Sequence, residues 1–348
     1  MHNLHTQIVL ARDWESNPTG IALAADTLRT GGLVVFPTET VYGLGANALD
    51  AEAVAGIFRA KGRPADNPLI VHITAPEEVQ PLVAHIPDIA HLLMTRFWPG
   101  PLTLIMPRSN IVPDIVTGGL DTVAVRMPAH PVARAILRRA GVPVAAPSAN
   151  LSGTPSPTAA AHCRSDMTGR VDVIVDGGDC PLGVESTVLS LTGDRPRLLR
   201  PGAVTAAQLE EVLGSGSIDI DPAVTAPLAV DAAASSPGMK YRHYAPKMPL
   251  TIVHGSRLDF LRFAAQQTDA CFLVFHGEEA QITAHAIAYG NENDAQSQAR
   301  GLFAALRRLD DTAITATQAY ARAPAIEGVG MAVYNRLLRA ASFRELYL

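Results

Sequence analysis

The apolar positions in the first two thirds of the chain alternate between strand-like and helix-like spacing. Residues 33–36 form a short apolar run of the kind that is buried in a sheet, whereas Val54 and Phe58 share one face of a helix. Asp50 is suited to cap that helix at its start, and Gly62 is suited to end it. This alternation predicts a mixed α/β domain.

Six more apolar runs in this part of the chain have the length of strands, and proline or glycine-rich turns close several of them. They are residues 69–73, 102–106, 123–127, 142–146, 171–175 and 187–191. Together they predict one sizeable sheet, whose strand order the pattern leaves open.

The pattern changes after about residue 214. Up to about residue 234 the chain is rich in Ala, Pro, Ser, Asp and Thr without a helical or strand period, which is typical of a linker. From Leu250 onward a second α/β unit is predicted, with strands at 250–253 and 271–275 and helices at 258–265, 295–309 and 330–341. We therefore expect a first domain over residues 1–213, a linker over 214–249 and a smaller second domain over 250–348.

The composition fits two domains and limits the classes of function. The chain has 348 residues, of which 48% are hydrophobic and 18% charged, and this suffices for two globular cores. Its net charge of -5 argues against a protein that coats nucleic acid by bulk electrostatics. Any role with RNA is therefore expected to be indirect or confined to a patch.

Neither a membrane segment nor a cysteine-based metal site is indicated. Proline interrupts the longest apolar runs long before the roughly 20 residues of a membrane span. The N-terminus lacks the apolar region of a signal peptide, and Cys163, Cys180 and Cys271 are too widely spaced for a zinc site or a disulfide framework. We expect a cytoplasmic protein.

The first stretch with chemical potential is the turn at residues 37–45, which reads Pro-Thr-Glu-Thr-Val-Tyr-Gly-Leu-Gly and follows a predicted strand. Its glycines superficially fit a dinucleotide fingerprint, but they do not open the next helix, and Arg63 stands about where the ribose-binding acid should be. The turn can present backbone N–H groups to a ligand. It can equally be structural, with Thr38 and Thr40 satisfying backbone groups.

Lys61, Arg63, Asn67 and His72 follow in a proline-braced loop that leads into a strand. Cations at the end of a helix complement its dipole, so Lys61 and Arg63 have a sufficient structural explanation. The fixed offsets of a guanidinium, an amide and an imidazole also suit an anionic ligand, because arginine can grip phosphate through two hydrogen bonds.

Two later segments place hydroxyl and cationic groups near strand ends. Thr122 and Arg126 are four residues apart on a predicted strand and so lie on one face, which would put the two groups side by side. An arginine on an apolar strand needs an acidic partner or an anionic ligand. Ser156, followed by proline, is suited to cap a helix, and helix N-termini bind phosphate.

Residues 185–188, Glu-Ser-Thr-Val, and Arg200 add a hydroxyl pair at the start of a strand and a cation at the end of another. Either the hydroxyl pair or the arginine could be an exposed surface group without a role in function. The sequence has no Gly-x-x-x-x-Gly-Lys-Ser/Thr loop, no His-Glu-x-x-His and no Gly-x-Ser-x-Gly elbow. If the protein uses ATP, it binds ATP through a different kind of cradle.

In chain order, four motifs closely resemble the YrdC-like family of threonylcarbamoyl-adenylate synthases. They are Pro-Thr-Glu-Thr-Val-Tyr-Gly-Leu, Lys-x-Arg-Pro-x-x-Asn-Pro-Leu-x-Val-His, Pro-Ser-Ala-Asn-x-Ser-Gly and Ser-Thr-Val. The resemblance covers roughly residues 15–210, and the tail from residue 236 looks like the longer, two-domain branch of the family. It implies an α/β fold with a twisted open sheet and a concave, positively lined cavity, followed by a small Rossmann-like domain.

The resemblance also implies which residues contact each substrate. Threonine would be contacted by Thr40, His72, Arg126, Ala146 and Ser186. ATP would be contacted by Arg63, Asn67, Thr122, Ser148, Asn150, Ser156, Arg200, Tyr241 and His243, with Lys61 and Arg63 as the catalytic cations. The segment 236–249 would fold back over the cavity as a lid.

The implied activity is the formation of threonylcarbamoyl-AMP and pyrophosphate from L-threonine, bicarbonate and ATP, with magnesium on the phosphates. The product would serve threonylcarbamoyladenosine modification of tRNA through a downstream transferase complex. No side chain is required as a covalent nucleophile, because positioning and charge stabilisation suffice for such a step.

Two alternatives stay open at this point. An RNA-binding module, which could include weak contact with tRNA, would need a long basic groove rather than a nucleotide-sized pocket. A carbamoyl-adenylating transferase would be expected to carry extra modules with paired cysteines, and the sequence lacks them.

Overall fold

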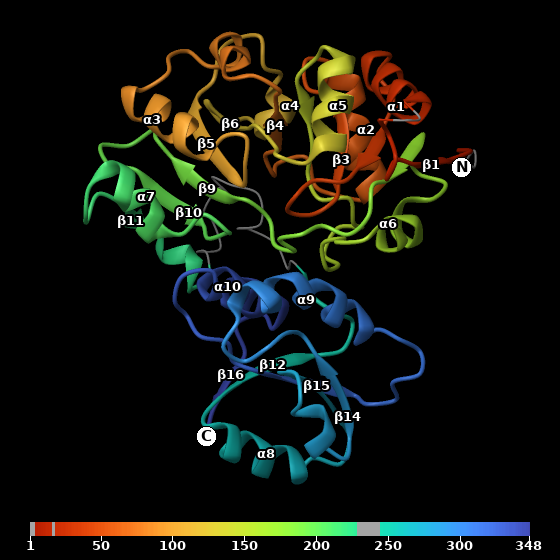
Figure 1. Cartoon of the computed structure of the whole chain (residues 1–348), viewed down its shortest axis with the longest axis vertical. Coiled ribbons are helices and arrows are strands. Elements are labelled where there is room, and N and C mark those ends of the chain that lie inside the picture. Colours follow the sequence, from red (N-terminus) through yellow and green to blue (C-terminus); the bar gives the residue numbers. More distant parts are fainter. Residues whose placement is uncertain (1–3, 16–17, 228–243) are drawn as a thin grey trace.

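The computed structural model describes residues 4–15, 18–227 and 244–348, and these form two lobes (Figure 1). Residues up to 227 build the larger lobe, and residues from 244 onward build the smaller one. Helices α9 (Ala295–Arg308) and α10 (Gly330–Ala340) lie on the side of the smaller lobe that faces the larger lobe. The two predicted α/β units are therefore present, and these two helices lie between them.

The larger lobe is built on an 11-stranded mixed sheet with the order β1-β8-β2-β3-β7-β4-β6-β5-β9-β10-β11. Every apolar run that we predicted as a strand of this domain overlaps one. The strands are β1 (Gln7–Leu10), β2 (Val34–Phe36), β3 (Gly43–Asn47), β4 (Ile70–His72), β5 (Leu102–Pro107), β6 (Thr122–Arg126), β7 (Val144–Ala145), β8 (Val173–Asp176), β9 (Thr187–Ser190), β10 (Arg197–Arg200) and β11 (Asp219–Ile220).

Seven helices and two short 3₁₀ turns cover this sheet. They are α1 (Thr19–Arg29), α2 (Ala51–Lys61), α3 (Asp88–Phe97), α4 (Asp114–Thr117), α5 (Pro131–Ala140), α6 (Ala160–Met167), α7 (Ala206–Leu213), η1 (Pro76–Leu82) and η2 (Pro222–Val224). The helix predicted from its caps is confirmed. The Asp50 carboxylate accepts from the backbone N–H groups of Glu52 and Ala53, and Gly62 ends the helix in the left-handed region at φ 61°.

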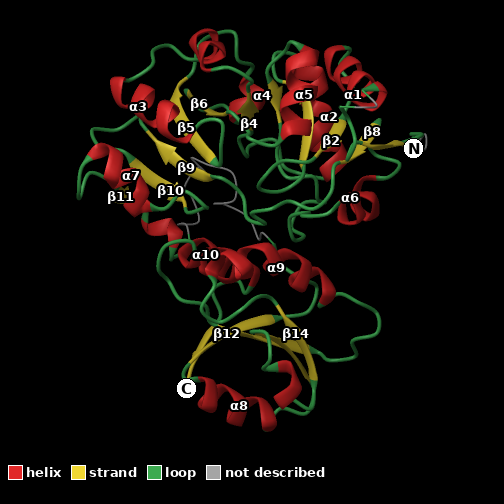
Figure 2. Cartoon of the chain, in the orientation of Figure 1, coloured by secondary structure: helices red, strands yellow, loops and turns green. Residues whose placement is uncertain are grey.

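The smaller lobe is a three-layer α/β unit. Its parallel five-stranded sheet has the order β14-β13-β15-β12-β16, with α8 on one face and α9 and α10 on the other (Figure 2). Its remaining elements are β12 (Leu250–His254), α8 (Arg257–Ala265), β13 (Ala270–Val274), η3 (Glu279–Gln281), β14 (His285–Ala288), β15 (Gln318–Arg322) and β16 (Glu345–Tyr347). Helices on both faces of a parallel sheet match the Rossmann-like expectation.

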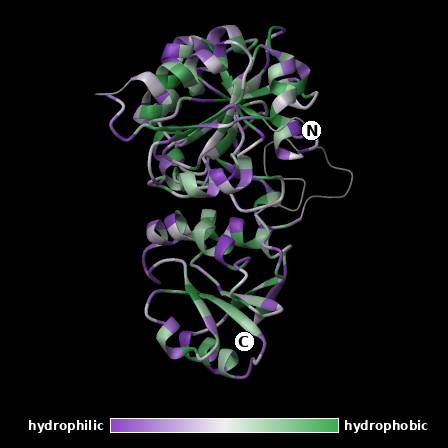
Figure 3. Ribbon diagram, turned by 90° about the vertical axis from the view of Figure 1, so that its right-hand side faces the viewer, coloured by the Kyte–Doolittle hydropathy of each residue, from purple (hydrophilic) through white to green (hydrophobic). Residues whose placement is uncertain are grey.

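Hydrophobic residues gather along the strands inside each lobe, and hydrophilic residues gather on the outer faces of the helices (Figure 3). The larger lobe has its main core between the sheet and α2 and α3, where Ile57, Leu104 and Val125 are buried. None of the helices in the described part of the chain combines the length and apolar character that a membrane span requires.

Three local predictions need correction. Ser156 does not cap a helix, because α6 begins only at Ala160 and its N-cap position is Ala159, which makes no side-chain cap bond. The stretch 37–45 is not one turn, since Gly43 already begins β3. The predicted linker is structured at its start, where β11 pairs with β10 and extends the sheet beyond residue 213.

The contact between the lobes is close at the loop that precedes β9. Val184 belongs to the same buried cluster as Leu302 and Phe303 of α9, so apolar packing crosses from one lobe to the other. Gly183 in this loop has φ 79°, and a Cβ on it would lie 2.4 Å from the Ala299 carbonyl oxygen of α9. The close approach of helix and loop therefore requires glycine here.

We predict that Gly183→Ala lowers the free energy of unfolding more than Gly178→Ala does. Gly178 also has a positive φ, of 90°, but a Cβ there would meet nothing within 4 Å. Both variants should lose about 1 to 2 kcal/mol because alanine resists a left-handed backbone. Gly183→Ala should lose about 1 to 3 kcal/mol more from the clash with α9. Urea denaturation measures both, and equal losses would show that the loop and α9 are not in contact in solution.

Candidate functional site

A cavity lies in the larger lobe, at the ends of several strands of the sheet. Eight of the predicted site residues line it: Thr40, Arg63, His72, Arg126, Ala146, Ser148, Ser186 and Arg200. They come from segments up to 160 positions apart in the sequence, and the sheet order brings them together.

The register of the sheet sets two of these side chains beside each other. His72 ends β4 and Arg126 ends β6, and the two strands pair in parallel so that these residues are direct neighbours. Thr103 of β5 is the neighbour of Arg126 on its other side. Because cross-strand neighbours point to the same face, an imidazole, a guanidinium and a hydroxyl form one row, of which His72 and Arg126 line the cavity.

The Arg126 guanidinium is buried and bonds to residues 39 and 40, and its Nε donates to the Gly100 carbonyl oxygen at 3.3 Å. It forms an ion pair with Glu39 at 2.5 Å and donates to the Thr40 hydroxyl at 2.9 Å. Burial alone would raise the pKa of the Glu39 carboxyl, but the charge and hydrogen bond of Arg126 outweigh that effect and lower it. The sequence predicted an acidic partner or an anionic ligand for Arg126, and the structure provides the partner.

His72 is neutral at physiological pH. Burial, assisted by the nearby Arg126 charge, lowers the pKa of its imidazole to about 3. Its Nδ1 lies 3.1 Å from the Ile70 carbonyl oxygen. A carbonyl can only accept, so Nδ1 carries the proton and Nε2 is left as a hydrogen-bond acceptor.

Ser186 and Arg200 form a second polar group in the cavity. The Ser186 hydroxyl lies 2.7 Å from the Thr103 hydroxyl, and Arg200 donates to the Ser186 hydroxyl at 3.2 Å and to its carbonyl at 3.0 Å. These bonds fix the direction of the Ser186 hydroxyl. The serine is therefore held between the row that contains Arg126 and the cation at the end of β10.

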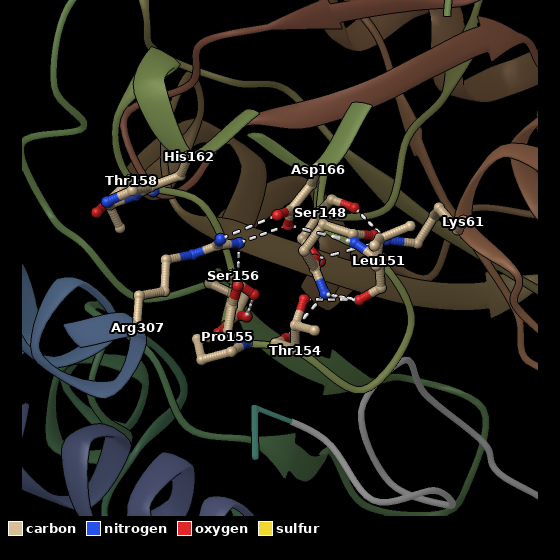
Figure 4. Close-up of polar contacts among 12 residues, drawn as sticks. Lys61, Ser148, Leu151, Thr154, Pro155, Ser156, Thr158, His162, Asp166 and Arg307 are labelled. Carbon is tan, nitrogen blue, oxygen red and sulfur yellow. Dashed lines mark hydrogen bonds and ion pairs between the residues drawn. The ribbon is translucent and has the colours of Figure 1, made fainter. Parts of the chain in front are cut away.

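Lys61 does not line the cavity but holds the backbone of a segment that does. Its ammonium group donates to the carbonyl oxygens of Ser148 and Asn150 (Figure 4). Burial, together with the neighbouring Arg63 charge, lowers the pKa of this lysine well below its ordinary value. Asn150 is equally internal, since its side-chain oxygen accepts from the Ser148 hydroxyl and its amide group donates to the Thr154 carbonyl.

Arg63 and Asn67 lie in the loop after α2. Arg63 faces the cavity and donates to the carbonyl oxygens of Asn67 and Pro68 at 3.3 Å and 3.2 Å. The side-chain amide of Asn67 is buried, and neither its nitrogen nor its oxygen has a hydrogen-bond partner in the described part of the chain. A buried amide of this kind is an expected contact for a ligand.

The structure separates two other predicted residues, Thr122 and Ser156, from the cavity. Thr122 shares a face with Arg126 but lies at the far end of β6, in a groove with Ser190 and Leu199, so the two groups are not side by side. Ser156 is fully buried and donates to Glu185 at 2.5 Å. Tyr241 and His243 lie outside the described residues, as does most of the predicted lid.

Glu185 and Tyr244 line the cavity and were not predicted as site residues. Glu185 belongs to the Glu-Ser-Thr-Val motif and Tyr244 to the segment predicted as a lid, so motif membership was the available signal in both cases. Burial would raise the pKa of Glu185, but the charges of Arg336 and Arg200 outweigh this effect and lower it. Tyr244 adopts a positive φ of 61° and is buried.

The arrangement suits small anionic ligands. Three guanidinium groups, from Arg63, Arg126 and Arg200, line one cavity together with several hydroxyls. The two carboxylates close to it, Glu39 and Glu185, are each paired with an arginine. Fixed cations and hydroxyls of this kind stabilise carboxylate, carbamate and phosphate oxygens.

Comparisons with known proteins agree over nearly the whole chain. Residues 26–202 match the Sua5/YciO/YrdC family model, described as "Telomere recombination", and residues 204–342 match the model described as "Threonylcarbamoyl-AMP synthase, C-terminal domain". The threonylcarbamoyl-AMP synthase of Pyrococcus abyssi is 48% identical over 329 residues, which cover 93% of this chain and 94% of the relative. That of Bacillus subtilis is 46% identical over 344 residues, 95% of each chain.

A solved structure extends the similarity to the fold. The crystal structure of P. abyssi Sua5 complexed with L-threonine matches with a TM-score of 0.89 at 44% sequence identity. The match covers 99% of each chain, so it includes both lobes and their arrangement.

We predict that His72 makes the protein less stable in acid. Above pH 6.5 the imidazole is neutral in both the folded and the unfolded chain. Below that pH only the unfolded chain takes up a proton, until the folded pKa of about 3 is reached. The free energy of unfolding should therefore fall by up to about 1.4 kcal/mol per pH unit on account of this group.

His72→Gln removes the titrating group, so its unfolding free energy should depend less steeply on pH below 6.5. Urea denaturation from pH 7 to about pH 4 measures the two slopes. His162, whose pKa burial lowers to about 4, is present in both proteins, so its contribution cancels in the comparison. Parallel pH profiles would mean that His72 is not buried as a neutral group.

Proposed function

The chain belongs to the threonylcarbamoyl-AMP synthase family, and we propose that it forms threonylcarbamoyl-AMP and pyrophosphate from L-threonine, bicarbonate and ATP. Family membership confirms the resemblance that the four motifs predicted. The observation that carries the proposal is the single cavity in which Thr40, His72, Arg126 and Ser186 meet Arg63, Ser148 and Arg200. The first set was predicted to contact threonine and the second to contact ATP.

We propose that threonine binds against the row formed by His72 and Arg126. The Arg126 guanidinium supplies a positive charge for the carboxylate, and its pairing with Glu39 and Thr40 fixes its position. The neutral His72 offers Nε2 as an acceptor for the threonine hydroxyl. In support, a P. abyssi relative has been solved in complex with L-threonine.

ATP would lie beside threonine with its phosphates toward Arg63 and Arg200. Both guanidinium groups line the same cavity as Arg126, and the Ser148 hydroxyl lies in the same wall. The unpartnered amide of Asn67 is next to Arg63 in the loop and would gain its hydrogen bonds from the nucleotide. Lys61 would act by holding the loop of Ser148 rather than by touching the phosphates.

The chemistry requires positioning more than covalent help. The threonine amine adds to the carbon derived from bicarbonate, and water is lost as the carbamate forms. A carbamate oxygen then attacks the α-phosphorus of ATP, and the bond from that phosphorus to the bridging oxygen breaks, releasing pyrophosphate. Fixed cations stabilise the negative charge that shifts between these groups.

Magnesium is proposed to arrive with ATP. Among the residues that the structure describes, no group of three or more His, Cys, Asp and Glu side chains could hold a metal ion. Magnesium commonly retains water and binds through substrate phosphates, so the cationic and hydroxyl lining of the cavity fits a metal carried by the triphosphate. When bound, it would neutralise charge on the departing pyrophosphate.

The product is proposed to serve a tRNA-modifying transferase in the cytoplasm, where ATP and tRNA occur together.

The two alternative functions are less well supported. The polar residues converge on one cavity, as in a small-ligand site, rather than spreading along a groove that could hold a strand of RNA. The carbamoyl-adenylating alternative does not account for a chain that matches threonylcarbamoyl-AMP synthases from end to end.

We predict threonine-dependent pyrophosphate release that Arg63→Ala reduces by about 100-fold or more, because one fixed cation at a phosphate contributes roughly that factor. Purified protein is supplied with ATP, magnesium, bicarbonate and L-threonine, and pyrophosphate is measured with and without threonine. Arg59→Ala is the matched control, since Arg59 is an exposed arginine of α2, the helix that leads into the loop of Arg63, and pairs with Glu52.

Arg59→Ala should release pyrophosphate at the parent rate. Release that does not depend on threonine would refute the proposed reaction. Equal losses in the two arginine variants would refute the assignment of Arg63 to the phosphates.

A further inference from the structure

Two arginines of the smaller lobe bond to residues of the larger lobe that lie beside the cavity. The first is Arg307 of α9, which donates through both terminal nitrogens to the carboxylate of Asp166 in α6, at 2.7 Å and 3.1 Å (Figure 4). The same guanidinium donates to the Pro155 carbonyl oxygen at 2.6 Å. It is partly buried, with 15% of its side chain exposed. The two-point grip on Asp166 ties α9 to α6, and the third bond ties it to Pro155, the residue immediately before Ser156.

The second is Arg336 of α10, whose side chain is 0% exposed. Its Nε donates to a Glu185 carboxylate oxygen at 2.8 Å, and its Nη1 donates to the Pro201 carbonyl oxygen at 2.7 Å. Pro201 directly follows Arg200, a cation that lines the cavity. Arg336 therefore holds both Glu185 and the backbone next to Arg200 in place, and both of these residues line the cavity.

The contacts of both arginines meet at Ser156. Arg307 holds the carbonyl of the preceding residue, and Arg336 holds Glu185, whose other carboxylate oxygen accepts from the Ser156 hydroxyl at 2.5 Å. Asp166, which Arg307 grips, also accepts from the backbone of Leu151 at 3.4 Å. The second lobe thus anchors the end of the loop 148–156.

The start of the same loop is anchored from the first lobe, by the bonds from Lys61 to the carbonyl oxygens of Ser148 and Asn150. Of the loop residues predicted to serve ATP, Ser148 lines the cavity, whereas the side chains of Asn150 and Ser156 bond to other residues of the protein. A loop held at both ends has little freedom to change the position of the Ser148 hydroxyl in the cavity. Displacement of such a group by about 1 Å can cost two orders of magnitude in rate.

Arg336 also controls the charge of the cavity. Glu185 lines it, and an unpaired carboxylate there would repel the anionic substrates and would be costly to bury. The buried guanidinium of Arg336, which does not line the cavity, forms an ion pair with this carboxylate and neutralises its charge. The binding of anions in the cavity thus depends on a cation that belongs to the other lobe.

We propose that Arg307 and Arg336 are positioning residues for the nucleotide part of the site, so that the smaller lobe sets the geometry in which ATP binds. This inference rests on the proposed function, because it assumes that the loop 148–156 serves ATP. Neither arginine lines the cavity or touches the reacting atoms. Both act through the residues that they hold.

A role restricted to docking the two lobes would lower stability and leave substrate binding unchanged. The test therefore compares the KM values for ATP and threonine in Arg307→Met, which removes the guanidinium and keeps an unbranched apolar side chain. Arg308→Met is the matched control, because Arg308 is the exposed neighbour on the same helix. Thermal unfolding of each variant is measured in parallel.

We expect Arg307→Met to raise the KM for ATP by about tenfold, which is the size of a lost charge-assisted hydrogen bond. The KM for threonine should stay within about twofold of the parent value, since the row of His72 and Arg126 does not contact the loop's far end. Arg308→Met should match the parent in both constants. If Arg307→Met does not fold, Arg307→Lys retains the charge without the two-point grip and should raise the KM for ATP about threefold.

Arg336 is tested by rescue. Arg336→Met leaves Glu185 charged and unpaired, so the KM for ATP should rise by about tenfold or more. Adding Glu185→Gln removes that charge while preserving an oxygen that accepts from Ser156. The double variant should recover at least severalfold of the loss.

Folded Arg307 variants whose KM for ATP equals that of Arg308→Met would overturn the role of Arg307. A double variant no better than Arg336→Met alone would overturn the role of Arg336 in neutralising Glu185. Failure of the proposed function is a different result, because the parent protein itself would then show no threonine-dependent pyrophosphate release.

Discussion

The burial of charge is the constraint on which the rest of this site depends. A guanidinium or carboxylate that leaves water must gain a partner, because an unpaired buried charge costs about several kcal/mol. Arg126 and Glu39 satisfy each other in one part of the cavity wall, and Arg336 and Glu185 do so in another. These two pairs let the cavity present cations to anionic substrates while its own carboxylates are neutralised.

The sheet makes the first pair possible, and the packing of the lobes makes the second. Parallel pairing of β4 with β6 aligns His72 with Arg126, so the residues proposed to hold threonine are fixed by backbone hydrogen bonds. Glu185 lies in the loop before β9, where the approach of α9 and α10 brings Arg336 within 2.8 Å. Rigid elements on both sides therefore preorganise the cavity, and preorganisation is what an electrostatic mechanism requires.

Much of the fold was predictable from local pattern. Seven of the eleven strands of the first domain, the capped helix α2 and the α/β character of the tail follow from apolar spacing and from residues such as Asp50 and Gly62. Motif resemblance gave the family and eight residues that line the cavity.

Local pattern failed at Ser156, where the Ser-Pro signal predicted a helix start but the serine hydroxyl instead donates a tertiary hydrogen bond to Glu185. It also set Thr122 beside Arg126, although the length of β6 keeps them apart. Contacts across 151 positions, such as Arg336 with Glu185, have no signature in one sequence.

The most direct test of the central claim follows the carbon of bicarbonate into the product. Purified protein is incubated with ATP, magnesium, L-threonine and ¹³C-labelled bicarbonate, and the quenched mixture is analysed by mass spectrometry. The account predicts an adduct of threonine, one labelled carbon and AMP, formed in step with pyrophosphate. Pyrophosphate release without this adduct, or an adduct that lacks the label, would contradict it.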